Sequence, residues 1–163
     1  MKKINGLIST FFGYGYLTKI PGTVTSLVTT VFIYIAYEYL GYTDLKFSII
    51  FFTLLFFYSF YAVKDAESEF KNKDPRQIVI DEVLGQAIPL IFVLYLSQNN
   101  QLSLQIEIYY VLSFVFFRFF DILKPFPVSY FDKNFKNYFG IIMDDIMAGL
   151  YSMLLIYLIS LKF

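Results

Sequence analysis

Five long apolar stretches, almost free of charge, constrain this chain more than any other feature. They cover residues 24–40, 47–63, 83–97, 107–123 and 145–161. Each is close to the lower limit of the roughly 17–25 residues that a helix needs to cross a bilayer. The chain is 58% hydrophobic and only 16% charged, whereas about 25% of residues are charged in a typical soluble domain. We therefore expect an all-α integral membrane bundle of about five apolar helices, forming a single domain over residues 1–163.

The third stretch, residues 83–97, is the least regular of the five. It is short and contains Gly85, Gln86 and Pro89. Glycine and proline weaken or bend helices. We expect this segment to be kinked, tilted or only partly inserted.

Basic residues divide unevenly between the two sides of such a bundle. Five successive crossings put the N-terminus on the same side as the connections after the second and fourth helices. All of the 13 lysines and arginines except Lys46 and Lys162 fall on that side. Because loops rich in lysine and arginine remain in the cytoplasm, we expect this side, and any polar site on it, to face the cytoplasm.

The residue types that the chain lacks exclude several kinds of chemistry. There is no cysteine and no histidine, which excludes disulfides, thiolate metal sites, cysteine nucleophiles and imidazole acid–base catalysis. The 13 basic residues balance the 13 acidic residues, and no basic patch indicates a nucleic-acid partner. Any catalysis must use carboxylates, lysine, arginine, hydroxyl groups or a bound hard metal ion.

Two adjacent pairs of acidic residues lie at the ends of apolar stretches on the lysine-rich side. Carboxylates at the border of an apolar zone are costly and usually functional, and Mg²⁺ prefers oxygen ligands. We predict that four residues bind Mg²⁺: Asp81, Glu82, Asp144 and Asp145. Ala148 and Gly149 are small enough for a neighbouring helix to approach the second pair closely. For Asp81 and Glu82 the alternative is ordinary stabilisation of a helix N-terminus.

The segment FRFFDILKPFP, residues 117–127, carries charges at regular intervals. Arg118, Asp121 and Lys124 are three residues apart, so they share one face of a helix. Arginine and lysine can hold phosphate oxygens, which makes Arg118 and Lys124 candidate phosphate-binding residues, with Lys64 as a weaker candidate. The alternative is a plain intrahelical ion pair between Arg118 and Asp121.

The stretch GYGYLTKIPGT, residues 13–23, combines a glycine-rich turn with the start of the first apolar helix. Glycines of this kind serve any tight turn, but the position of the stretch favours contact with a phosphate or a lipid headgroup. Thr23 either caps the helix or donates a hydrogen bond to a phosphate oxygen.

Five segments of the chain together resemble the bacterial phosphatidylglycerophosphatase A family. They are GYGYLTKIPGT, VKDAE, IVIDEVLGQ, FRFFDILKPFPVSYFDK and FGIIMDDIMAGLYS, in that order, and the similarity extends over about residues 11–160. The resemblance implies a mostly helical enzyme of the bacterial inner membrane. Such an enzyme removes the terminal phosphate of phosphatidylglycerophosphate, using Mg²⁺, to give phosphatidylglycerol.

Within this reading the charged residues receive specific roles. A metal-activated water attacks phosphorus in the simplest mechanism, and Asp121 orients Arg118 or acts as a base. In the rival mechanism an aspartyl-phosphate forms on Asp65, Asp121 or Asp144. The acyl chains of the phospholipid are expected to stay among membrane lipids, so that only the headgroup needs a site.

A function of another class is also compatible with acids at the membrane border. An ion- or proton-coupled transporter would use such carboxylates, but it predicts polar residues spread through the membrane depth. A non-catalytic membrane scaffold is a third possibility.

Overall fold

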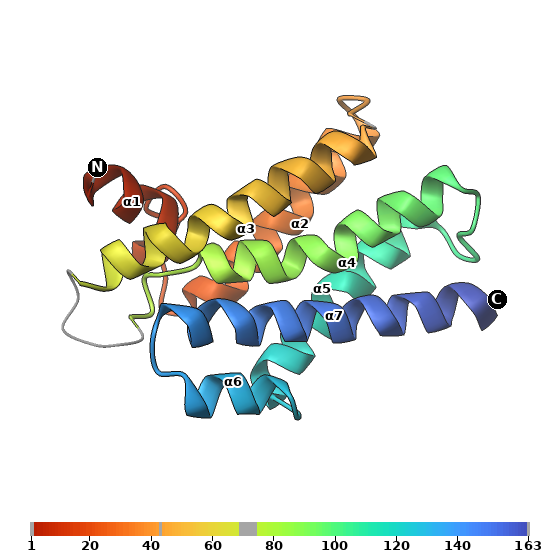
Figure 1. The fold of residues 1–163 in the computed structure, drawn as a ribbon. Coiled ribbons are helices and arrows are strands. Elements are labelled where there is room, and N and C mark those ends of the chain that lie inside the picture. The colour runs from red at the N-terminus through yellow and green to blue at the C-terminus, as the bar shows by residue number, and fades with distance from the viewer. Residues whose placement is uncertain (1, 43, 69–74, 163) are drawn as a thin grey trace.

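The computed structural model of the chain describes residues 2–42, 44–68 and 75–162. Within these ranges the fold is entirely helical and contains no strand (Figure 1). The elements are α1 (Lys2–Ser9), the 3-10 helix η1 (Tyr14–Tyr16), α2 (Pro21–Glu38), α3 (Leu45–Glu67), α4 (Ile80–Gln98), α5 (Ile106–Leu123), α6 (Val128–Asn134) and α7 (Tyr138–Lys162). The all-α prediction is confirmed.

Local sequence signals fix several of the helix ends. Pro21 opens α2 at its first position, where a missing N–H costs nothing. Asp44 caps α3, because its side chain accepts a hydrogen bond of 3.0 Å from the backbone N–H of Phe47. Lys124 ends α5 in a left-handed conformation, with φ at 46°, and Pro125 follows it. The side chain of Asn137 accepts from the N–H of Phe139 at the start of α7.

The five predicted stretches correspond to α2, α3, α4, α5 and α7, and two α-helices and the 3-10 helix η1 were not predicted. Helix α1 is short, and α6 lies in a proline-rich connection that has no apolar period of helical length. Helix α7 begins at Tyr138, seven residues before the predicted stretch. Asp144 and Asp145 therefore lie in its second turn and not at its first residue.

Helix α4 lies at the centre of the bundle and packs against α2, α3, α5 and α7. It is the most buried of the long apolar helices, and it runs without interruption from Ile80 to Gln98 with Pro89 inside it. Its closest neighbour is α7. A Cβ on Gly149 would overlap the carbonyl oxygen of Gly85, and a Cβ on Gly85 would lie 2.6 Å from the carbonyl oxygen of Asp145. The predicted close approach at Gly149 is confirmed, and Gly85 is its counterpart.

Three helices are long and apolar enough to cross a membrane, judged by length and composition within the described ranges. They are α3, α4 and α7. The expected number of about five is thus only approximate for membrane crossings. Helices α2 and α5 are not among them; α5 carries three charged residues, Glu107, Arg118 and Asp121.

The polar connections collect at one end of the bundle. Figure 1 places α1, the end of α3 and the starts of α4 and α7 at this end, and the turns after α2 and α4 and the C-terminus at the other. This arrangement agrees with alternating helix directions. Lys71 and Lys73, which contribute to the charge asymmetry of the sequence, lie outside the described residues.

Candidate active site

A polar cavity of about 310 Å³ opens at this end of the bundle. Five helices contribute to it: the first turns of α2 and α4, the last turns of α5, helix α6 and the first half of α7. Most residues predicted for the site line this cavity, namely Thr23, Asp81, Glu82, Arg118, Asp121, Lys124, Asp144 and Asp145. Residues more than 120 positions apart in the sequence thus share one polar chamber.

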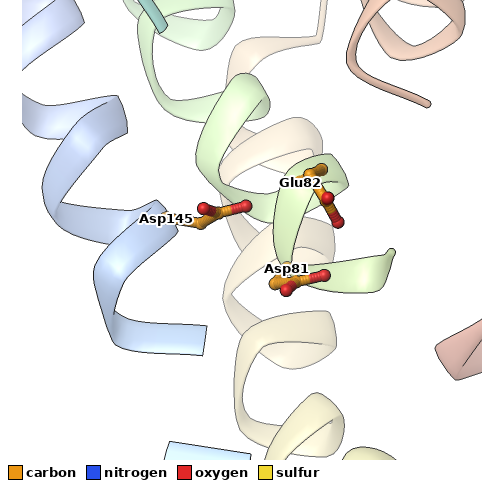
Figure 2. Close-up of side chains that lie close together, drawn as sticks. All are labelled: Asp81, Glu82 and Asp145. Carbon is orange, nitrogen blue, oxygen red and sulfur yellow. The ribbon is translucent and has the colours of Figure 1, made fainter. Parts of the chain in front are cut away.

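Three of the four predicted metal ligands form a compact group. One carboxylate oxygen from each of Asp81, Glu82 and Asp145 lies within 4.8 Å of the other two. In Figure 2, Asp81 and Glu82 lie on the first turn of α4, and Asp145 projects toward them from α7. The glycine contact between the two helices lies one turn away, because Gly85 follows Asp81 by four residues and Gly149 follows Asp145 by four. The close helix crossing brings these acids together.

The chemistry of this group suits a divalent cation. Asp81 is 8% exposed and Asp145 only 4%. Glu82 Oε2 and Asp145 Oδ2 are buried and accept no hydrogen bond from the described residues. Mg²⁺ binds oxygen ligands at about 2.1 Å, and three carboxylate oxygens within 4.8 Å of one another could serve one such ion. Adjacent negative charges at a largely buried site are strongly unfavourable without a cation.

Arg118 lies beside the acidic group and is held by Asp121. Its Nη1 forms an ion pair of 2.7 Å with Asp121 Oδ2, as the three-residue spacing predicted, and lies 3.5 Å from Ser26 Oγ on α2. Its Nε is buried and donates to no described residue. One edge of the guanidinium is thus anchored by Asp121, while the Nε donor has capacity for another acceptor.

Lys124 forms a second pairing in the same cavity. Its Nζ lies 2.6 Å from Asp144 Oδ2 and 2.8 Å from Asp132 Oδ1. Burial lowers the pKa of Lys124, but the charges and hydrogen bonds of Asp144 and Asp132 outweigh this and raise the pKa well above its ordinary value. Lys124 therefore stays protonated. Asp144 lies outside the group of three acids and is instead a partner of this lysine.

The start of α2 forms another wall of the cavity. The residue before the helix is Ile20, whose side chain makes no capping bond, and Pro21 is the first residue of the helix. Thr23 is therefore the third helical residue and does not cap the helix. The capping alternative for Thr23 is wrong because Pro21 starts the helix two residues earlier. A Cβ on Gly22 would overlap Glu82 Oε1. With glycine at this position, the helix N-terminus, with its free N–H groups, lies directly against the Glu82 carboxylate; a larger residue would require that carboxylate to move.

Lys64 and Asp65 do not line the cavity. Asp65 Oδ2 accepts a hydrogen bond of 2.7 Å from Asn5 on α1, and Asn5 in turn accepts one from the Tyr58 hydroxyl. Lys64 Nζ lies over the ring of Tyr138, 5.5 Å from its centroid. Both residues connect α3 to neighbouring helices, and their predicted catalytic and phosphate-binding roles have no support in this placement.

Four charged residues of the cavity received no role from the sequence. Asp132 comes from α6, and its pKa is lowered because the hydrogen bond from Lys124 and nearby lysine charges outweigh the effect of burial. Lys19, Arg76 and Lys136 form a basic rim. All four residues lie in loops or in the unpredicted helix α6, where the sequence shows no helical periodicity. The sequence predicted only that they lie on the lysine-rich side.

The sequence pattern of the family described as Phosphatidylglycerophosphatase A matches residues 7–160. The chain belongs to this family. It is 35% identical over 154 residues to the phosphatidylglycerophosphatase A of Haemophilus influenzae, covering 94% of this chain and 87% of that protein. It is 29% identical over 154 residues to the Escherichia coli protein of the same name, covering 94% and 82%.

Another relative is named for a different lipid. A Bacteroides thetaiotaomicron protein, "Putative phosphatidylinositol-3-phosphatase", is 36% identical over 151 residues, covering 92% of this chain and 89% of that protein. No solved structure matches the chain. As a member of the phosphatidylglycerophosphatase A family, the chain is a phosphatase, a phosphoric monoester hydrolase. Its apolar helices and its family make it a membrane protein.

Proposed function

We propose that the protein hydrolyses phosphatidylglycerophosphate to phosphatidylglycerol and phosphate, with Mg²⁺, at the cytoplasmic face of the bacterial inner membrane. The observation that carries the proposal is that one cavity holds a group of three acids, the buried Asp81 and Asp145 and the half-buried Glu82, together with an arginine and a lysine. Family membership and the names of the H. influenzae and E. coli relatives support the choice of lipid.

Asp81, Glu82 and Asp145 are the proposed ligands of Mg²⁺. When bound, the ion would supply positive charge that balances the phosphate and stabilises the charge that moves during P–O cleavage. The proposal is supported by the buried, unpartnered oxygens of Glu82 and Asp145. It narrows the set of four acids expected from the sequence, because Asp144 is bonded to Lys124.

The phosphate group would lie between Arg118, Lys124 and the start of α2. Arg118 is oriented by Asp121, and Lys124 is kept charged and in place by Asp144 and Asp132. The free N–H groups of Gly22 and Thr23 at the helix N-terminus favour an anion. These groups bind the oxygens that carry the developing charge.

The reaction is an attack of water on phosphorus. The water oxygen forms the new P–O bond as the bond from phosphorus to the glycerol oxygen breaks. One proton of the water stays on the phosphate, and the other reaches the departing glycerol oxygen. Because phosphoryl transfer proceeds through a loose transition state, positioning and charge stabilisation supply most of the catalysis. The ion pair with Arg118 favours an orienting role for Asp121 over that of a base.

The aspartyl-phosphate alternative narrows to two candidates. Asp121 and Asp144 line the cavity, whereas Asp65 is engaged with Asn5 outside it. The transporter alternative has less support. It requires charged groups along the membrane depth, but the acids of α4 lie in its first turn and those of α7 in its second turn, all at the end that holds the cavity.

The basic side of the bundle supports the proposed orientation. The cavity opens between connections that hold Lys19, Arg76 and Lys136, and basic connections remain in the cytoplasm. The same rim would attract anionic phospholipids.

Phosphate release from phosphatidylglycerophosphate by the purified protein in detergent tests the function. We expect release with Mg²⁺ and none after chelation. Asp81→Asn and Asp145→Asn are expected to lower kcat by roughly a hundredfold or more, because each removes charge from the site of P–O cleavage. Phosphatidylinositol 3-phosphate serves as a second substrate, which distinguishes the two lipids named among the relatives.

Glu107→Gln is the matched control, because Glu107 lies in the first turn of α5 at the opposite end of the bundle. Its activity should equal that of the wild type. Release that does not need Mg²⁺ would contradict the metal assignment, and full activity of both aspartate variants would contradict the proposed ligands.

A further inference from the structure

An apolar groove runs along the side of the bundle between α3, α4 and α7. We call it the lateral groove; it has a volume of about 570 Å³ and extends from Leu84 and Ile146 at one end to Leu45 and Tyr95 at the other. Apart from Thr53 and the Tyr95 hydroxyl, its lining is apolar. The exposure of Ile49 at 47% and Phe57 at 67% places it on the outside of the bundle.

The lateral groove begins within one helical turn of the polar cavity. Asp81, which lines the cavity, is followed on α4 by Leu84, Ile88, Ile91 and Tyr95, all of which line the groove. These positions follow at alternating intervals of three and four residues, so they form one stripe along the helix. On α7, Ile146 follows Asp145 directly. A molecule with its polar end at the carboxylates would therefore lie next to an apolar stripe along α4.

The length of the lateral groove matches the depth of one membrane leaflet. Leu84 and Tyr95 are separated by about 16 Å along α4, since each residue of a helix advances 1.5 Å. One leaflet contributes half of the hydrocarbon core, or about 15 Å. The groove thus reaches from the carboxylates to about the middle of the bilayer.

Its surroundings determine what fills the groove. The lining offers water too few polar partners, and the three helices that form it are those able to cross a membrane. A linear hydrocarbon chain satisfies the shape, the chemistry and the length. We propose that the lateral groove binds one acyl chain of the phospholipid substrate and so holds its headgroup at the cavity; this proposal rests on the proposed function and revises the expectation that the acyl chains need no site.

A second apolar groove provides an internal comparison. It has a volume of about 420 Å³ and lies between α2, α3 and α4, where Phe32, Ala36 and Phe47 are among its lining residues. The two grooves share Phe52 and Ile91. On α4 the second groove begins at Ile91, ten residues after Asp81, whereas the lateral groove begins at Leu84, three residues after Asp81. Because the second groove begins about two helical turns farther from the carboxylates, comparing the two distinguishes a substrate site from general contact with lipid.

Kinetics with two chain lengths test the proposal. The full-length protein in detergent is given dipalmitoyl or dihexanoyl phosphatidylglycerophosphate. Thr53 is exposed at the lateral groove, so Thr53→Trp fills it without disturbing the core. We expect this variant to raise KM for the dipalmitoyl lipid about five- to tenfold with kcat unchanged, because binding common to ground and transition state is lost. KM for the dihexanoyl lipid should stay the same.

Ala36→Trp in the second groove is the matched control and should change neither KM. Equal effects of the two variants, or equal effects of Thr53→Trp on both substrates, would overturn the proposal. The latter result would instead indicate a structural lipid or a second copy of the chain in the groove. Wild-type protein that hydrolyses neither lipid would contradict the proposed function alone.

A binding measurement keeps the acyl-chain site testable without catalysis. The chain has no tryptophan, so Phe56→Trp in the lateral groove and Phe32→Trp in the second groove each introduce a single tryptophan whose fluorescence can be excited selectively. Phosphatidylglycerol with brominated acyl chains, at low mole fraction in detergent, should quench Phe56→Trp at several-fold lower concentration than Phe32→Trp. Equal quenching of the two would overturn the proposal.

Discussion

At the scale of single residues, Asp144 and Asp145 are chain neighbours with different surroundings. Asp145 points to Asp81 and Glu82 on α4, whereas Asp144 is bonded to Lys124 at 2.6 Å. Adjacent residues of a helix point about 100° apart, which directs them to different partners. The sequence predicted both as ligands because it contains no information about which direction faces α4.

We therefore expect Asp144→Asn and Asp145→Asn to impair activity through different kinetic parameters. Asp145→Asn is expected to raise the Mg²⁺ concentration needed for half-maximal activity about tenfold or more, since it weakens a proposed ligand. Asp144→Asn should leave that concentration unchanged and raise KM for the lipid, because it loosens Lys124. Activity measured as a function of Mg²⁺ and of lipid separates the effects. Identical Mg²⁺ dependence of the two variants would contradict this division.

At the scale of elements, the contact of α4 with α7 determines the geometry of the acidic group. Small residues let helices approach until their backbones touch, and Gly85 and Gly149 do this one turn from Asp81 and Asp145. The small residue on α7 was recognisable from the sequence. Its partner was not, because Gly85 lies in a stretch where glycine and Pro89 suggested an irregular or partly inserted helix.

Gly149→Ala should separate the two helices. Because the new Cβ would overlap the Gly85 carbonyl oxygen, we expect a loss of about 1–3 kcal/mol in stability together with reduced activity. Thermal unfolding in detergent and phosphate release measure both. Gly6→Ala is the control, since nothing lies within 4 Å of its Cβ position; it should leave both quantities unchanged or slightly improve stability.

At the same scale, helix α6 was not predicted from the sequence. Its seven residues are too few for a periodic signal, and the prolines around it resemble a loop. Yet α6 supplies Asp132, the second partner of Lys124. Long apolar helices and paired acids are recognisable from the sequence itself. The contact of Lys124 with Asp132 on this short helix depends on tertiary packing, which the sequence pattern does not reveal.

At the scale of the whole molecule, the concentration of lysines and arginines at one end of the bundle predicts a fixed orientation in the membrane. The absence of cysteine allows single cysteines to report it. Lys133→Cys on α6 and Gln101→Cys in the turn after α4 lie at opposite ends, and both side chains are exposed. In intact cells stripped of the outer membrane, a membrane-impermeant thiol reagent should label Gln101→Cys and not Lys133→Cys. The reverse pattern would contradict the proposed cytoplasmic site.

The end of the bundle that holds the site was predictable at this scale, but the set of residues that line the cavity was not. Charge asymmetry placed the acids, Arg118 and Lys124 on one side of the bundle, and the structure gathers them in one cavity. The same reasoning also placed Lys64 and Asp65 there. Both are near the correct end, but side-chain direction on α3 takes them to α1 and α7, which no count of charges reveals.

The polar cavity opens at one end of the bundle, and the lateral groove opens along its flank. The two products of hydrolysis would therefore depart by different routes, inorganic phosphate into the aqueous compartment and the dephosphorylated lipid sideways into its own leaflet. Neither departure blocks the other. Inhibition by phosphate should depend on its concentration in the aqueous compartment, and inhibition by the lipid product on its mole fraction in the membrane. The two kinds of product inhibition would therefore vary independently in the cell.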